Sequence, residues 1–247
     1  MTPDAAPEPA AVVAERALGL LRTGDIAIEG RLVDASNATL YCAISDAELT
    51  AACVYKPIRG ERPLWDFPDG TLAYREVAAY RVSEATGWSI VPPTVLRDGP
   101  VGPGMVQLWI DVDESVDLAG LVRSRQPALR RMALFDAVVN NADRKGGHLL
   151  PLPDGHVYGV DHGVCFSVEP KLRTVLWGWR GERLDDDELF VLSDLRAQLA
   201  GQLCADLQAL LAPDEVEGTV ARVDALLAAG CFPYPSPDWP AIPWPPF

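Results

Sequence analysis

The order of hydrophobic patterns along the chain constrains its fold more than any other sequence feature. Between residues 25 and 58, three runs of alternating apolar residues each suit a β-strand. An amphipathic helical pattern follows at 72–87, two more strand-like runs lie at 94–99 and 104–112, and helical patterns dominate from about residue 116. This segregation of strands and helices predicts an α+β fold.

The remaining patterns complete the element order. Two short strands at 148–152 and 156–160 flank the turn P-D-G, as in a β-hairpin. The last residues, 232–247, carry seven prolines and suit an extended segment that packs its aromatic residues on the body, or alternatively a free proline-rich ligand. Further helices are expected over residues 10–22, 127–144, 192–211 and 213–230.

The formal net charge of −14 limits the partners of the chain. A surface of this sign disfavours nucleic acid and anionic membranes as general partners. The sequence has no apolar run long enough for a transmembrane helix, so no integral membrane association is expected. The N-terminus opens with acids and prolines rather than with the basic residues of a secretory signal, which indicates a cytoplasmic protein with reduced cysteines.

Two residues in the strand-rich half suit nucleotide phosphoryl transfer. Lys56 ends the third strand-like run, in C-V-Y-K-P, where a phosphate-binding lysine would lie. Glu76, in the following helix, suits its carboxylate partner, with Glu84 as the second choice. Taken singly, each is better explained as a solvated charge, so the prediction depends on the combination.

The segment D-A-S-N-A, residues 34–38, could form a phosphate-binding loop between the first two strands. The backbone N–H groups of Ser36, Asn37 and Ala38 could line a phosphate, and Ser36 could add its hydroxyl. The segment has no glycine, and an ordinary hairpin turn explains it equally well.

Two aspartate-led loops carry the most specific signal. Kinases have a catalytic-loop Asp followed five positions later by a metal-binding Asn. In D-R-K-G-G-H, Asp143 is followed at that spacing by His148, and the hairpin then leads to Asp161-His162-Gly163, where kinases have D-F-G. Because the hairpin strands flank a tight turn, Asp143 and Asp161 should lie at the same end of the hairpin.

The segments F-D-A-V-V-N-N-A-D-R-K-G-G-H and V-Y-G-V-D-H-G-V-C-F resemble the catalytic and metal loops of the phosphoinositide 3-/4-kinase-like superfamily, and within it an actinobacterial branch. The resemblance is strongest over 130–167 and extends by element order over 25–210. It implies that Asp143 is the catalytic-loop aspartate, that Asp161 binds a metal and that Lys56 binds nucleotide phosphates. ATP and Mg or Mn are the implied cofactors.

The resemblance also implies a two-lobed protein-kinase-like fold, with a small β-rich N-lobe containing one helix and a mainly helical C-lobe. Glu76 would orient Lys56, and Asp136 would be a buried acid that braces the catalytic loop. The implied hinge, whose backbone meets the adenine, comprises Gln107, Leu108, Trp109 and Ile110. The implied parts are an N-terminal extension with a helix (1–23), the N-lobe (24–108), the C-lobe (109–231) and the proline-rich tail (232–247).

His148 replaces the family asparagine. Imidazole suits manganese, zinc or iron better than magnesium. One hypothesis is that His148 joins Asp161 as a metal ligand and makes manganese at least as good a cofactor as magnesium. The alternative is that His148 donates a hydrogen bond to Asp161 or Asp143 and touches no metal.

The favoured function is an ATP-dependent phosphotransferase, with transfer of AMP as a variant. The segment after the metal loop lacks a lysine cluster suited to inositol phosphates, so a soluble small molecule or a protein hydroxyl is expected as the phosphoacceptor rather than a lipid. A nucleotide-binding pseudokinase that regulates a partner is the first alternative. The second, less favoured alternative is a metal-dependent hydrolase that would use His148, His156, His162, Asp143 and Asp161.

Overall fold

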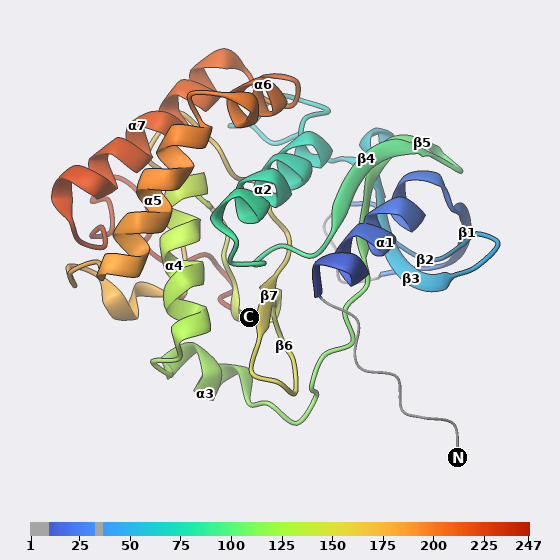
Figure 1. Cartoon of the computed structure of the whole chain (residues 1–247), viewed down its shortest axis with the longest axis horizontal. Coiled ribbons are helices and arrows are strands. Elements are labelled where there is room, and N and C mark those ends of the chain that lie inside the picture. Colours follow the sequence, from blue (N-terminus) through green and yellow to red (C-terminus); the bar gives the residue numbers. More distant parts are fainter. Residues whose placement is uncertain (1–9, 33–36) are drawn as a thin grey trace. The chain divides into compact units, whose positions relative to one another are not determined.

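The computed structural model describes residues 10–32 and 37–247, with the side chains of 10–13 left out. By their contacts, these residues form two compact units. Unit 1 comprises the chain up to Glu61 together with Pro93–Trp109, and unit 2 comprises Arg62–Pro92 and Ile110–Phe247. The sheet and helices of each unit can be followed in Figure 1.

Unit 1 is an antiparallel sheet with one helix, α1 (Ala10–Thr23). The strands are β1 (Asp25–Arg31), β2 (Leu40–Ser45), β3 (Thr50–Pro57), β4 (Thr94–Gly99) and β5 (Gly102–Leu108), paired in the order β1-β2-β3-β5-β4. Helix α1 packs on the sheet, and the Arg97 guanidinium on β4 donates to the carbonyls of Leu21 and Gly24 at the end of α1. The helix is therefore part of the sheet's own core.

Unit 2 is mainly helical and contains the predicted hairpin. Its helices are α2 (Leu72–Thr86), α3 (Leu118–Arg123), α4 (Pro127–Val139), α5 (Asp186–Gln198), α6 (Gln202–Gln208) and α7 (Pro213–Ala229), and its hairpin strands are β6 (Leu149–Pro151) and β7 (Val157–Gly159). Helix α2 packs on α5 and α6, and α4 packs on α7. Helix α2, which the sequence places between strands, thus shares its contacts with the helical part of the chain.

Two of the predicted helices differ from the structure in their boundaries. Helix α4 ends at Val139 instead of residue 144, because Asn140 adopts a left-handed conformation with φ 51° and caps the helix. The expected helix 192–211 is two helices, α5 and α6, separated at 199–201. Helix α5 begins earlier than predicted, since Asp185 and Glu188 form a capping box at its start.

One short helix was not predicted from the sequence. Helix α3 begins where the Asp117 carboxylate accepts hydrogen bonds from the N–H groups of Ala119 and Gly120. No helix in the described part of the chain is long and apolar enough to cross a membrane.

Candidate active site

A buried ion pair fixes the loop that follows α4. The Asp136 carboxylate is 0% exposed and accepts hydrogen bonds from Nε and Nη2 of Arg144 at 2.9–3.2 Å. Asn141 Nδ2 and Thr174 Oγ1 also donate to this carboxylate, at 3.0 and 3.3 Å. Because both charges are paired and hydrogen-bonded inside the protein, this set holds the loop without a free buried charge. Asp136 is thus a buried acid that braces the loop, as the resemblance implies.

Arg144 also connects the loop to the hairpin. Its Nη1 donates to the carbonyl of Val160 at 3.1 Å, and its Nη2 lies 2.6 Å from Nε2 of His162. Since a guanidinium only donates, His162 Nε2 is the acceptor. The His162 ring is fully buried and packs edge-on against Phe135.

The backbone after the second aspartate is held by α2. The Glu76 Oε2 atom accepts a hydrogen bond of 2.9 Å from the N–H of His162. Glu76 is almost fully buried, and Gly163 lies so close to α2 that a β-carbon there would be 3.3 Å from the β-carbon of Leu72. Asp161 itself has a φ of 60°, so its carboxylate leaves a sharply turned backbone.

Asp143 lies at the edge of this buried frame. Its N–H donates to Asn141 Oδ1 at 2.9 Å, and its Oδ2 lies 3.3 Å from Nζ of Lys145. Its side chain is 34% exposed. Burial raises the pKa of the Asp143 carboxyl, and the charge of Asp161 adds to this, while Lys145 and Arg173 act in the opposite direction. Asp143 and Asp161 are therefore close enough to influence each other, as the sequence predicts.

His148 and Asp161 form a second pair. Nε2 of His148 lies 3.4 Å from Oδ2 of Asp161, whose side chain is 50% exposed. Nδ1 of His148 lies 3.4 Å from the N–H of Lys145. With Nδ1 as an acceptor, a neutral ring would carry its proton on Nε2, the nitrogen that faces Asp161. This geometry fits both the hydrogen-bonding and the metal-ligand hypothesis for His148, and both stay predictions.

The histidines do not form a metal cluster. His156 Nε2 lies 3.0 Å from the carbonyl of Ser89, and its ring contacts Tyr158, while His162 is bound by Arg144. In residues 10–32 and 37–247, no group of three or more His, Cys, Asp or Glu side chains could hold a metal ion by itself. The arrangement therefore gives no support to the metal-hydrolase hypothesis.

The remaining predicted nucleotide-binding residues lie mainly in unit 1. Lys56 is half-buried on β3 opposite Met105, on the strand face opposite buried Tyr55. Its pairing with Glu76 stays a prediction, because these residues belong to different units. Ser36 lies outside the described residues, and Asn37 is half-buried. The N–H of Ala38 donates to the carbonyl of Gly60, so it is already used within unit 1.

The predicted hinge is partly engaged within its own sheet. The side chain of Gln107 is buried and donates to Thr94 Oγ1 at 2.8 Å. The backbone N–H groups of Leu108 and Trp109 donate to the carbonyls of Pro93 and Ala52. Ile110 is half-buried and begins the second part of unit 2.

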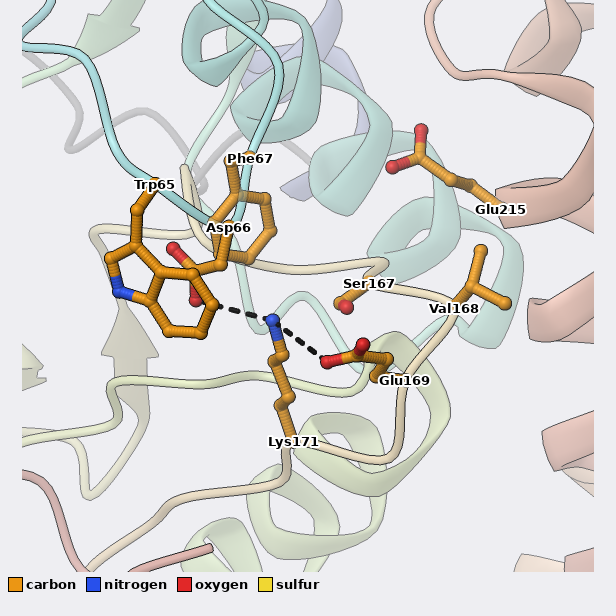
Figure 2. A pocket seen from close by; sticks show the side chains of 8 residues that line it. All are labelled: Trp65, Asp66, Phe67, Ser167, Val168, Glu169, Lys171 and Glu215. Atoms are coloured by element: carbon orange, nitrogen blue, oxygen red, sulfur yellow. Dashed lines mark hydrogen bonds and ion pairs between the residues drawn. The ribbon is translucent and has the colours of Figure 1, made fainter.

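A separate pocket of about 310 Å³ lies beside the segment that follows Asp161-His162-Gly163 (Figure 2). Lys171 lies at its centre, with Nζ 3.2 Å from carboxylate oxygens of both Asp66 and Glu169, and over the ring of Trp65. None of the predicted site residues lines this pocket, whose lining residues are Trp65, Asp66, Phe67, Ser167, Val168, Glu169, Lys171 and Glu215.

Sequence reasoning missed two cations beside Asp143. Lys145 forms the ion pair described above, and Arg173 lowers the pKa of Asp143 by its charge. The signal for Lys145 was present in the sequence, two positions after Asp143. Arg173 is distant in sequence and reaches the loop through backbone hydrogen bonds: its N–H donates to Asn141, and its carbonyl accepts from the N–H of Arg144.

Comparison with known proteins agrees with this geometry. No protein-family model matches the chain. Protein Rv2133c of Mycobacterium tuberculosis (strain ATCC 25618 / H37Rv) is 44% identical over 263 residues, which cover 92% of this chain and 94% of the relative. The chain belongs to the same family as Rv2133c.

A second relative has a named activity. Phosphatidylinositol 4-kinase gamma 4 of Oryza sativa subsp. japonica is 31% identical over 127 residues, which are 44% of this chain and 22% of that protein. The resemblance to the phosphoinositide 3-/4-kinase-like superfamily is thus confirmed, and the mycobacterial relative agrees with its actinobacterial branch.

Solved structures confirm the fold class. A structure of the Golgi casein kinase superposes with a TM-score of 0.52 at 13% identity, covering 90% of this chain and 75% of that one. The same kinase has also been solved with Mn and ADP bound. The Helicobacter pylori proinflammatory kinase CtkA gives a TM-score of 0.50 at 11% identity, covering 86% and 94%. The chain therefore has the expected α+β, protein-kinase-like fold.

Proposed function

We propose that the chain is an ATP-dependent phosphotransferase that acts on a hydroxyl group of a soluble small molecule or protein. The observation that carries this proposal is the placement of two partly exposed carboxylates, Asp143 and Asp161, at the edge of a buried and hydrogen-bonded frame. In phosphoryl transfer the protein mainly positions reactants and stabilises charge, and a rigid frame under two accessible carboxylates suits that task.

Each residue has a distinct role in the proposed reaction. The acceptor oxygen forms a bond to the γ-phosphorus while the bond from this phosphorus to the bridging oxygen of ADP breaks. Asp143 orients the acceptor hydroxyl and takes its proton, for which a raised carboxyl pKa is suitable. Lys145 and Lys56 offset phosphate charge.

Asp161 suits a nucleotide-bound divalent ion. Mg²⁺ in such sites is held by one or two carboxylates together with phosphate oxygens, so a cluster of three protein ligands is not required. The half-exposed Asp161 carboxylate fits this mode of binding. When bound, the metal would neutralise charge on the phosphates, and His148 would hold the Asp161 carboxylate in place by its hydrogen bond.

The first test measures nucleotide binding and turnover with purified protein. We expect ATP with Mg or Mn to raise the melting temperature of the wild type, and Asp161→Asn to lose most of this metal-dependent shift. Asp187→Asn, an exposed carboxylate on α5, is the matched control. Equal metal-dependent shifts in the wild type and Asp161→Asn would contradict the role of Asp161.

Lys56→Met tests the strand lysine independently. Loss of an ammonium that binds phosphates should weaken ATP binding about tenfold or more, since hydrogen bonds between charged groups contribute about 1.5–3 kcal/mol. Lys56 is only half-buried, so the protein should stay folded by circular dichroism. Unchanged ATP affinity by calorimetry would remove Lys56 from the site.

One observation favours the pseudokinase as a second candidate. Nε2 of His148 lies 3.4 Å from Oδ2 of Asp161, and in this candidate the imidazole competes with the metal for that carboxylate. A pseudokinase would bind nucleotide without turning it over. Metal-dependent formation of ADP, or its absence in a wild type that binds ATP, separates the two functions.

A further inference from the structure

The tail segment, residues 232–247, runs along the loops of unit 2 that carry the candidate site. It starts at Phe232, which exchanges backbone hydrogen bonds with Gly181 and Glu182. Three further contacts follow along the tail, at Trp239, at Ala241 and at Pro246 with Phe247. Each of them is connected to the catalytic loop through fewer intervening residues than the one before it.

The first of these contacts is at Trp239. Its ring stacks on Trp65 at a centroid distance of 6.2 Å and lies 4.8 Å from Nζ of Lys171. The backbone N–H of Lys171 donates to Oδ1 of Asn140, the residue that caps α4. Trp239 therefore contacts Lys171, and Asn140 connects Lys171 to the start of the catalytic loop. Figure 2 shows Lys171 between Asp66 and Glu169.

The second contact is at Ala241. Its carbonyl accepts two hydrogen bonds, from the N–H of Thr174 at 3.1 Å and from Nε1 of Trp177 at 2.7 Å. Thr174 is the residue whose hydroxyl donates to Asp136. The tail thus reaches the buried frame through one intervening residue.

The third contact is on the catalytic loop itself. The carbonyl of Pro246 accepts a hydrogen bond of 2.8 Å from the N–H of Gly146. The ring of Phe247 fills the space next to Gly146, and a β-carbon on that glycine would overlap the ring. Gly147, the next residue, has no atom within 4 Å of a β-carbon built on it. Of the two adjacent glycines in D-R-K-G-G-H, Gly146 is therefore the one that the tail requires.

We propose that the tail positions the catalytic loop through its contacts at Trp239, Ala241, Pro246 and Phe247, with Pro246 and Phe247 as positioning residues that act through Gly146. Gly146 begins the short turn that ends at His148 and directly follows Lys145. Holding the Gly146 N–H in place therefore also holds Lys145, the cation beside Asp143, on one side. On the other side it holds His148, which lies beside Asp161. This inference rests on the proposed phosphotransferase function.

The test uses the close contact between Gly146 and Phe247. Gly146→Ala should force the ring away and lower kcat about tenfold, because misplacing a catalytic group by about 1 Å can cost up to about 100-fold. Phe247→Ala should lower kcat by a smaller factor. In the double variant the ring is gone, so the alanine should cost no more than in Phe247→Ala alone, which is a non-additive result.

Two controls separate positioning from general stability. Trp244→Ala removes a tail tryptophan that is 85% exposed and should leave kcat unchanged. Hydrogen exchange of the amide of residue 146 should become faster in Phe247→Ala but not in Trp244→Ala. The KM for ATP should stay within about twofold in all variants, since a positioning defect acts on the chemical step.

The possible outcomes distinguish the two proposals. No turnover in the wild type would overturn the phosphotransferase function and the positioning role together. Turnover in the wild type that is unchanged in Gly146→Ala and Phe247→Ala would overturn the positioning role alone. Additive losses in the double variant would also overturn it, because the two residues would then act independently.

Discussion

The buried frame and the exposed carboxylates of unit 2 are neighbours in the chain but differ in their physical state. In the frame, Asp136 and Arg144 are both 0% exposed and fully paired. At the edge, Asp143 and Asp161 keep 34% and 50% of their side chains exposed, and burial raises the pKa of Asp143. The same residue type thus serves for structure at position 136 and is available for chemistry at positions 143 and 161.

This difference shows how a short loop can be held in place by buried groups and still present accessible carboxylates. The frame uses its charges internally, so none of them needs to meet a ligand. Asp143 lies 3.3 Å from Lys145 Nζ, and Asp161 lies 3.4 Å from His148 Nε2, so these contacts are longer than those between Asp136 and Arg144. Those long contacts can be exchanged for substrate or metal contacts at little cost.

The largest expected effect comes from breaking the frame. Asp136→Ala would leave the Arg144 charge buried without its partner, which should lower the free energy of unfolding by about 3–5 kcal/mol. Urea unfolding measures this loss directly. The comparison between the two regions is wrong if Asp136→Ala costs no more stability than Asp143→Ala.

The next largest effect comes from the exposed aspartate of the same loop. Asp143→Asn should lower kcat by about 10²–10⁴-fold, the range of general acid–base contributions, while the stability changes little. Phosphotransfer assays and urea unfolding on the same preparation test both halves. A variant with full activity would show that Asp143 does not act on the acceptor hydroxyl.

The sequence predicted the fold class and the juxtaposition of Asp143, Asp161 and His148, because the loops are local and joined by a short hairpin. The resemblance to the kinase-like superfamily also implied a buried role for Asp136. The sequence could not predict Arg173 beside Asp143, since that contact depends on backbone pairing between segments distant in sequence. Periodicity predicts elements, whereas such loop pairing is decided by tertiary hydrogen bonds.

Helix ends were missed for a related reason. The predicted helix ran on to residue 144, but Val139 is followed by Asn140 and Asn141, and the left-handed Asn140 turns its side chain to the carbonyls of Ser167 and Glu169. Asparagine tolerates this left-handed conformation at a helix end, and the tertiary contacts of its side chain hold it there. A tertiary contact also explains why position 146 needs a glycine, because the ring of Phe247 occupies the space where a β-carbon would lie.

A smaller effect is expected at His148. If its Nε2–H donates to Asp161, His148→Asn should keep this hydrogen bond and change the Mg-to-Mn preference by less than about threefold. If His148 is instead a metal ligand, the variant should shift clearly towards magnesium. Thermal shifts with each metal and ATP, in the wild type and the variant, decide between the two roles.

The smallest expected effect is the pH dependence of stability that Asp143 contributes. Because burial raises its pKa in the folded state, the folded protein holds the proton of Asp143 more tightly than the unfolded chain does. The stability from this group is complete below the unfolded pKa of about 3.9 and is lost as the pH rises through the raised folded value. Above that window, Asp143→Asn should therefore be slightly more stable relative to the wild type than it is at lower pH.

Urea unfolding of both proteins across this range measures the difference. A parallel pH dependence in the two proteins would mean that Asp143 titrates as it does in the unfolded chain, and the contrast between frame and edge would then rest on exposure alone.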